Sequence, residues 1–300
     1  ATGLFMYSCD AIEGLTDGDI SAEDLDNAIE ETNKAAKKAE LIDKYLRDDF
    51  TDKERYYVGR STCAYVFSNY ELIENEELTL YLNQVGTTMA LASNRYATFN
   101  GYRFVAFDDE HPNAYGTPGG MILISTGLLE LCENEDELAA VLAHEVEHVV
   151  KDHPMKAVSK ETKKAALLNL AKYYAQKELE KQEDILKALI GGLTDSFGSI
   201  ISDIMDSLDN GYERETEYEA DSGAIMTIQR AGYSVEALKT IIDKLPGNKE
   251  ESNYGSNHPT NEDRIMNIEE NIQELGISIH PILEKRTNRF NEMMTKTGIK

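Results

Sequence analysis

Basic residues are scarce in this chain of 300 residues: 30 Lys and Arg stand against 55 Asp and Glu, which gives a net charge of −25. Phosphate groups repel a chain this acidic, so its overall charge argues against binding to DNA, RNA or anionic lipid headgroups. We therefore expect no nucleic-acid partner. Apolar residues make up 41% and charged residues 28%, as in an ordinary globular protein of one large domain or two small ones.

Cysteines and long apolar runs are also scarce. The three cysteines, Cys9, Cys63 and Cys132, have no C-x-x-C spacing, and their odd number excludes a complete disulfide framework. No run of eighteen apolar residues occurs, so we expect no transmembrane span. Two interpretations of the segment Gly3–Cys9 stay open. It is either the end of a trimmed signal segment with a lipidated Cys9 and a peripheral or lipid-anchored membrane association, or an ordinary N-terminal segment.

Histidine is rare, with six in the chain, yet two of them lie four residues apart in an H-E-x-x-H sequence. Apolar residues at helical spacing over 138–150 predict a helix, with Asn134 as its N-cap. On such a helix His144 and His148 share one face, so both imidazoles point at one place. Glu145 lies one step around the helix, close enough to reach a water there. This pattern is typical of zinc proteases.

A catalytic zinc ion usually has three protein ligands and a water, so a third ligand is needed. The segment E-x-E-A-D places Glu217 and Asp221 on one face of a second predicted helix. Ala220 and Gly223 are small enough for that helix to pack closely. From spacing alone, two interpretations stay open: Glu217 is the third ligand, or the helix is acidic and solvated.

The hydrophobic pattern predicts an α+β fold that is mostly helical, with a small sheet before the H-E-x-x-H helix. Strands are expected at 102–107 and 121–125, and further helices at about 21–47, 49–67, 76–93 and 127–132. A long helical region, interrupted by glycines in its apolar part, is expected at about 156–208. Asn113 and Ala114 lie between the strands. They belong either to a sheet edge that binds an extended peptide or to an ordinary loop. The apolar part of the last helix, 189–201, fits a core stripe, a lid or a membrane contact.

Four segments in the same order resemble the M48 family of zinc metallopeptidases, a gluzincin family, and in particular its members in the bacterial cell envelope. They are Asn113-Ala114-Tyr115 with Pro118-Gly119-Gly120, the H-E-x-x-H segment with His153, the E-x-E-A-D segment, and Ser256-Asn257-His258-Pro259 followed by Arg264-Ile265. Two departures are Tyr115 where Phe is usual and a long segment after His153. The resemblance covers roughly residues 50–270.

The resemblance implies one zinc ion per chain, held by His144, His148 and Glu217. It gives Asp221 a supporting or proton-donating role and places His258 near the metal, although His258 also reads as a turn residue before Pro259. It implies a metallopeptidase domain at 49–272, after an N-terminal segment and helical arm at 1–48 and before a C-terminal extension at 273–300. His153 reads as structural support, because it does not share the helix face of His148.

Together these features predict a zinc-dependent endopeptidase that hydrolyses proteins or peptides, with Glu145 as the general base. The expected setting is envelope protein quality control, in the periplasm or as a lipoprotein. Two alternatives stay open: a chaperone-like protein of the envelope with little peptidase activity, and a self-inhibited protease blocked by His258 or the N-terminal arm. The sequence does not indicate the oligomeric state.

Overall fold

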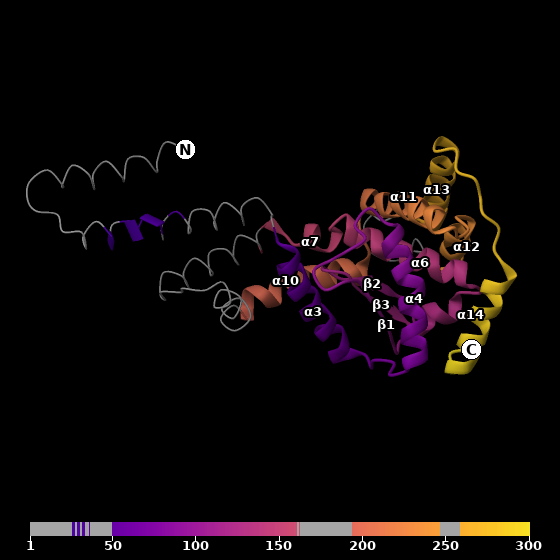
Figure 1. Cartoon of the computed structure of the whole chain (residues 1–300), viewed down its shortest axis with the longest axis horizontal. Helices are drawn as coiled ribbons and strands as arrows, with labels where there is room; N and C mark the ends of the chain where they lie inside the picture. The colour runs from indigo at the N-terminus through magenta and orange to yellow at the C-terminus, as the bar shows by residue number, and fades with distance from the viewer. Residues whose placement is uncertain are drawn as a thin grey trace, which may run out of the picture. The chain divides into compact units, whose positions relative to one another are not determined.

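The computed structural model describes residues 50–160, 194–246 and 259–300, together with single positions at 26, 27, 29, 30, 32, 33, 36 and 162. The chain divides into two compact units, Ala1–Asp49 and Phe50–Lys300. In the first unit the described positions are helical. All the labelled helices and strands of Figure 1 belong to the second unit. Most of the helix predicted at 21–47 lies outside the described residues, as do residues 161 and 163–193 of the helical region predicted at 156–208.

The second unit combines one small sheet with many helices, which confirms the predicted α+β class (Figure 1). The strands are β1 (Arg103–Phe107), β2 (Ala114–Gly116) and β3 (Met121–Ser125). The helices up to the end of the H-E-x-x-H segment are α3 (Asp52–Asn69), α4 (Glu76–Ala92), α5 (Thr126–Leu131) and α6 (Glu135–Val150). Those that follow are α7 (His153–Ala157), α10 (Thr194–Asn210), α11 (Arg214–Ala231), α12 (Glu236–Lys244), α13 (Asn261–Glu274) and α14 (Glu284–Thr297).

The sheet has the strand order β1-β3-β2, with β1 parallel and β2 antiparallel to β3. Because side chains alternate between the two faces of a strand, each face has its own apolar cluster. On one face Phe104 and Ile122 join the main core with α4 and α6. On the other face Phe107 and Leu123 pack with residues of α3 and α10. The sheet is therefore covered by helices on both faces, and β2 is left at one edge.

Local capping explains where the helices around the site begin. The Asn134 side chain accepts a hydrogen bond from the Glu137 N–H at 3.0 Å, so α6 starts where the sequence predicts. Thr51 and Asn75 cap α3 and α4 in the same way. The sequence pattern does not predict α7, α12, α13 or α14 as separate helices. The short α7 begins at His153 and ends at Ala157, at the start of the helical region predicted over about 156–208.

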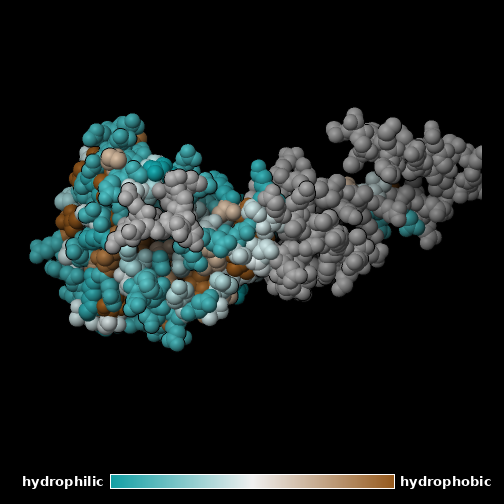
Figure 2. Space-filling view, turned by 180° about the vertical axis from the view of Figure 1, so that it is seen from behind, coloured by the Kyte–Doolittle hydropathy of each residue, from teal (hydrophilic) through white to brown (hydrophobic). Residues whose placement is uncertain are grey.

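Hydrophilic side chains cover most of the described surface on the face shown in Figure 2, with hydrophobic side chains scattered among them. This agrees with the excess of acidic residues in the sequence. Within the described ranges, the helices are all too short or too polar to cross a membrane.

Candidate active site

The helix α6 presents the two histidines of H-E-x-x-H inside the protein. Residues four apart lie on the same face of a helix, and the Nε2 atoms of His144 and His148 are 2.9 Å apart. His144 is 9% exposed and His148 is 2% exposed, so both rings are shielded from bulk water. The predicted helix and the predicted convergence of the two imidazoles are therefore both observed.

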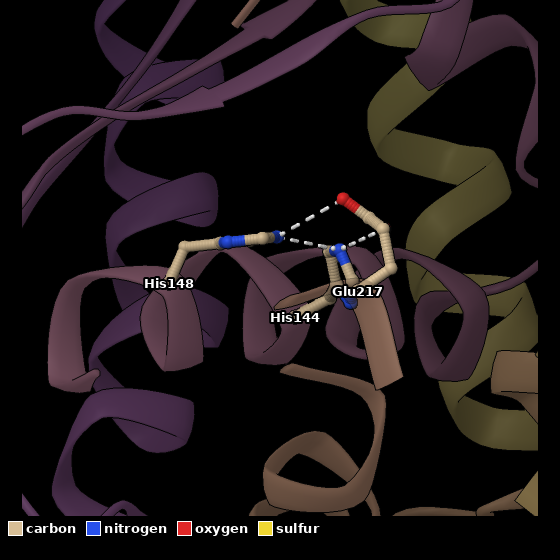
Figure 3. A group of neighbouring side chains, drawn as sticks. All are labelled: His144, His148 and Glu217. Carbon is tan, nitrogen blue, oxygen red and sulfur yellow. Dashed lines mark hydrogen bonds and ion pairs between the residues drawn. The ribbon is translucent and has the colours of Figure 1, made fainter. Parts of the chain in front are cut away.

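The helix α11 brings Glu217 to the same place. Its close approach to α6 depends on small residues: a Cβ atom added to Gly223 would lie 2.4 Å from Oε2 of Glu147 on α6. The Glu217 carboxylate lies 3.4 Å from Nε2 of His144 and 3.8 Å from Nε2 of His148. Figure 3 shows the three side chains pointing toward one another from two helices.

These three side chains fit a zinc ion. Ligand atoms in a tetrahedral zinc site, with bonds of about 2.0–2.1 Å, lie roughly 3.3 Å apart. The distances of 2.9, 3.4 and 3.8 Å among the nitrogens and the carboxylate oxygens bracket that spacing. Two imidazoles and one carboxylate are also a donor set found in catalytic zinc sites. Among the described residues, these three form the cluster with the geometry to hold a metal ion.

The electrostatics of the cluster favour a cation. Burial alone would raise the pKa of Glu217, but the charges of Arg264 and His144 lower it by more than burial raises it. The net shift is downward, so this carboxylate stays ionised. Burial, reinforced by the charge of His144, holds the pKa of His148 well below its usual range, so its imidazole is neutral. Burial also lowers the pKa of His144, but Asp221 and Glu217 outweigh it and raise the pKa to about 10. The same negative charges that favour a proton on His144 favour a metal ion beside it.

Asp221 lies behind His144, on the side away from the converging atoms. Its Oδ1 is 2.9 Å from Nδ1 of His144, and it has no exposed surface. Arg264 of α13 donates two hydrogen bonds to the same carboxylate, at 2.7 and 2.8 Å, and lies 3.1 Å from Glu217. Arg264 thus joins α11, the helix of Glu217, to α13. Arg264 belongs to a motif of the sequence, but its spacing predicts no role because it does not show that the side chain is buried.

Glu145 is the candidate general base. Burial raises the pKa of Glu145, whereas a hydrogen bond from the Gly116 N–H lowers it, with a net upward shift. A carboxylate with a raised pKa is a stronger base. A Cβ atom added to Gly116 would lie 2.7 Å from the Glu145 carbonyl oxygen and 3.1 Å from its Oε2. Gly116 is not among the site residues predicted from the sequence, although a glycine within a strand is a known sign of close backbone approach.

The predicted peptide-binding segment is strand β2. The hydrogen bonds from Ser125 N to Asn113 O and from Thr117 N to Met121 O show which residues face β3. Since the bonding direction alternates along an antiparallel strand, the backbone groups of Ala114 and Gly116 point away from β3. Ala114 therefore lies on a sheet edge. The Asn113 side chain donates to Asp109 at 3.4 Å.

His153 contacts the nitrogen of His148 that faces away from the cluster: their Nδ1 atoms are 2.9 Å apart. It is thus placed as structural support for the candidate ligand His148, although its spacing alone predicts that it would not face that ring. The aromatic ring of Tyr212 stacks on His148, with ring centroids 4.5 Å apart. No motif pointed to Tyr212, although it comes just before the helix of Glu217.

His258 and Cys9 lie outside the described residues. The predicted capping of the metal by His258 and the lipidation of Cys9 therefore stay predictions, as does self-inhibition by His258 or the N-terminal arm.

Comparison with known proteins gives a consistent result. The model of a protein family described as "Peptidase family M48" matches residues 76–272, which is more than half of the chain. The β-barrel assembly-enhancing protease of Escherichia coli K12 is 27% identical over 189 residues, 63% of this chain and 36% of that protein. The putative β-barrel assembly-enhancing protease of Vibrio cholerae is 26% identical over 258 residues, 83% of this chain and 50% of that protein.

A mitochondrial relative is also similar. The mitochondrial metalloendopeptidase OMA1 of Schizosaccharomyces pombe is 29% identical over 173 residues, which cover 56% of this chain and 46% of that protein. The chain thus spans between about a third and a half of the length of these three relatives. Residues 273–300, which contain α14, lie beyond the family match.

Proposed function

The chain belongs to peptidase family M48, and from that premise we propose that it is a zinc-dependent endopeptidase that hydrolyses proteins or peptides. The observation that carries this proposal is the convergence of His144, His148 and Glu217 from two helices on one buried point. These three side chains would hold the metal, and three protein ligands are the number that catalytic zinc sites use together with a water.

When bound, zinc supplies a Lewis acid that lowers the pKa of a water molecule and polarises a peptide carbonyl. Glu145 accepts the proton of the attacking water and then delivers it to the leaving amine. The Gly116 N–H fixes the carboxylate of Glu145 while it does so. Asp221 orients the ring of His144 through the nitrogen that is not a ligand, and Arg264 holds Asp221 in place.

The outward edge of β2 supports a mode of substrate binding. An extended peptide can add to this edge as a further strand, with the backbone groups of Ala114 as its partners. Gly116 belongs to the same edge and contacts Glu145, so a peptide bound there lies next to the proposed base. Asn113 stands at the start of this edge and is proposed as a second contact with the substrate.

We place this activity in protein quality control of the bacterial envelope. The support is the similarity to two bacterial relatives whose names refer to β-barrel assembly. Membrane β-barrels are a structure typical of bacterial outer membranes, so these names point to the envelope. A periplasmic or lipid-anchored form of this chain belongs to the same proposal.

A single substitution tests the chemistry. Glu145→Gln keeps the shape of the side chain but cannot accept a proton. We expect the variant to bind one zinc ion per chain and to keep the wild-type melting temperature. We also expect cleavage of unfolded casein to fall by about 10²–10⁴-fold. A chelator should abolish the wild-type cleavage, and added zinc should restore it. Undiminished cleavage by Glu145→Gln would show that Glu145 is not the base.

A further inference from the structure

A chain of polar side chains leads away from His148 on the side opposite the proposed metal. Nδ1 of His148 lies 2.9 Å from Nδ1 of His153, and Nε2 of His153 lies 3.2 Å from the Glu219 carboxylate. The other oxygen of Glu219 is 3.1 Å from Nζ of Lys151. Every step is within hydrogen-bond or ion-pair distance. The side chain of His153 is 2% exposed and that of Glu219 is 45% exposed. This hydrogen-bonded relay of His148, His153 and Glu219 therefore runs from the interior to solvent.

The backbone after α6 brings His153 to this place. On a continuous helix a residue five positions after His148 would not share its face. Asp152 has φ of 60°, in the left-handed region that residues other than glycine seldom adopt. This turn ends α6 and directs the chain back, so that His153 meets the ring of His148. Arg55 holds both carboxylate oxygens of Asp152, at 2.9 and 2.8 Å, which stabilises the turn.

The hydrogen-bond directions of the relay are determined by its two ends. Nε2 of His148 points at His144 and Glu217, and it needs a lone pair there to bind a cation. The proton of a neutral His148 is then on Nδ1 and is donated to Nδ1 of His153. His153 in turn carries its proton on Nε2 and donates it to Glu219. An ionised carboxylate only accepts hydrogen bonds, so the relay ends without conflict.

We propose that His153 and Glu219 are positioning residues that fix the tautomer and the ring orientation of the ligand His148. The inference rests on the proposed zinc site and deepens it. The other imidazole, His144, has the Asp221 carboxylate directly at its Nδ1, whereas Nδ1 of His148 is connected to the Glu219 carboxylate through a second imidazole. Tyr212 stacks on His148, and its ring centroid lies 5.9 Å from that of His153. It therefore packs against both imidazoles where they contact each other.

Three variants and a control test the relay. His153→Phe keeps a ring but removes both nitrogens, His153→Asn keeps a short polar group in place of Nδ1, and Glu219→Gln removes the charge at the exposed end. Glu215→Gln, also an exposed glutamate of α11, is the control. The primary measurement is the zinc dissociation constant from competition with a chromophoric chelator. The absorption spectrum of the Co²⁺-substituted protein reports the geometry of the ligands.

We expect His153→Phe to weaken zinc binding by about 10–100-fold, the range for partners of metal-ligating histidines, and to shift the Co²⁺ bands. His153→Asn should recover part of this loss, and Glu219→Gln should weaken binding by about threefold to tenfold. Glu215→Gln should match the wild type. Because Glu219 is half exposed, its variant tests the relay even where His153→Phe does not fold.

Wild-type zinc affinity in Glu219→Gln and His153→Asn, with unchanged Co²⁺ spectra, would overturn the relay while leaving the zinc site in place. A wild-type protein that binds no zinc would instead overturn the proposed function itself. The two failures are therefore distinguishable.

Discussion

The two ends of α6 both bury charged side chains, but they use them differently. At the N-terminal end, three consecutive acids are almost fully buried: Glu135 and Asp136 are 0% exposed and Glu137 is 2% exposed. Each acid has a cation from the C-terminal part of the chain, namely Arg289, Arg286 and Lys244, respectively. At the other end, nitrogen atoms of two imidazoles and an oxygen of one carboxylate lie within 4.8 Å of one another.

The ion pairs at the N-terminal end of α6 connect this helix to the C-terminal part of the chain. Glu135 also accepts hydrogen bonds from Tyr81 at 3.0 Å and Tyr233 at 2.8 Å. The guanidinium of Arg286 lies 4.0 Å from the ring centroid of Tyr233. Each of these acids is thus paired with its own cation, and no metal-binding cluster forms among the described residues at this end. At the site end the cation Arg264 binds Asp221 and also lies 3.1 Å from Glu217, beside the proposed metal site. The positions of the cations therefore distinguish the N-terminal end of α6, which is held by ion pairs, from the end that carries the proposed metal site.

The largest effect should follow removal of residues 284–300, which form α14 and the chain end. The buried acids would lose Arg286 and Arg289, and the core would lose Phe290 and Met294, both 0% exposed. Leaving a buried acid without its cation, or removing a buried core side chain, lowers the free energy of unfolding by several kcal/mol. The total free energy of unfolding of a typical protein is about 5–15 kcal/mol. We expect the truncated chain to show no cooperative unfolding by circular dichroism. A truncated protein with a wild-type melting temperature would show that α14 does not anchor α6.

The next largest effect should be on turnover, through a substitution next to the proposed base Glu145. In Gly116→Ala the added Cβ would meet the Glu145 carbonyl oxygen at 2.7 Å, so the proposed base must move. A displacement of about 1 Å can reduce turnover by about 100-fold. We expect such a fall in kcat with zinc still bound. Gly198→Ala on α10 is the matched control, because nothing lies within 4 Å of its added Cβ. Equal kcat values in the two variants would show that the contact with Gly116 does not position Glu145.

A smaller effect should follow loss of charge at the anchored end. Glu135→Gln keeps the shape of the side chain but weakens its bonds to Arg289 and the two tyrosines. We expect a loss of about 1–3 kcal/mol in the free energy of unfolding, measured with urea. The zinc dissociation constant should not change. Glu130→Gln on the exposed face of α5 should leave both quantities unchanged. Altered zinc affinity in Glu135→Gln would mean that the two ends are not separate in function.

The smallest effect should come from breaking an exposed ion pair between α14 and α4. Lys296 lies 2.8 Å from Glu77, but the two side chains are 64% and 54% exposed. Exposed pairs contribute about 0–1 kcal/mol because solvent and salt screen them. We expect Lys296→Ala to lower the free energy of unfolding by less than about 1 kcal/mol, with no change in activity. A loss as large as that of Glu135→Gln would remove the distinction between buried and exposed pairs.

Local patterns predicted much of the architecture. Capping by Asn134 and the apolar spacing after it placed α6, and alternating apolar segments placed β1 and β3. The segment around Ala114 was left open between strand and loop, because three residues have too little periodicity to decide. Pairing with β3 made it a strand. The short α7 was not anticipated, because the left-handed turn at Asp152 depends on Arg55, almost 100 residues earlier in the chain.

The sequence by itself determined that His144, Glu145 and His148 would share a helix, since helical spacing is a local property. It also placed Glu217 and Asp221 on one face of a second helix, but it left open whether that face met the histidines. Only the tertiary structure brought Glu217 to them, put Asp221 behind His144 and linked His148 to Glu219 through His153. The physical reason is that contacts between distant segments depend on how whole helices pack, and small residues such as Gly223 allow that packing without specifying it.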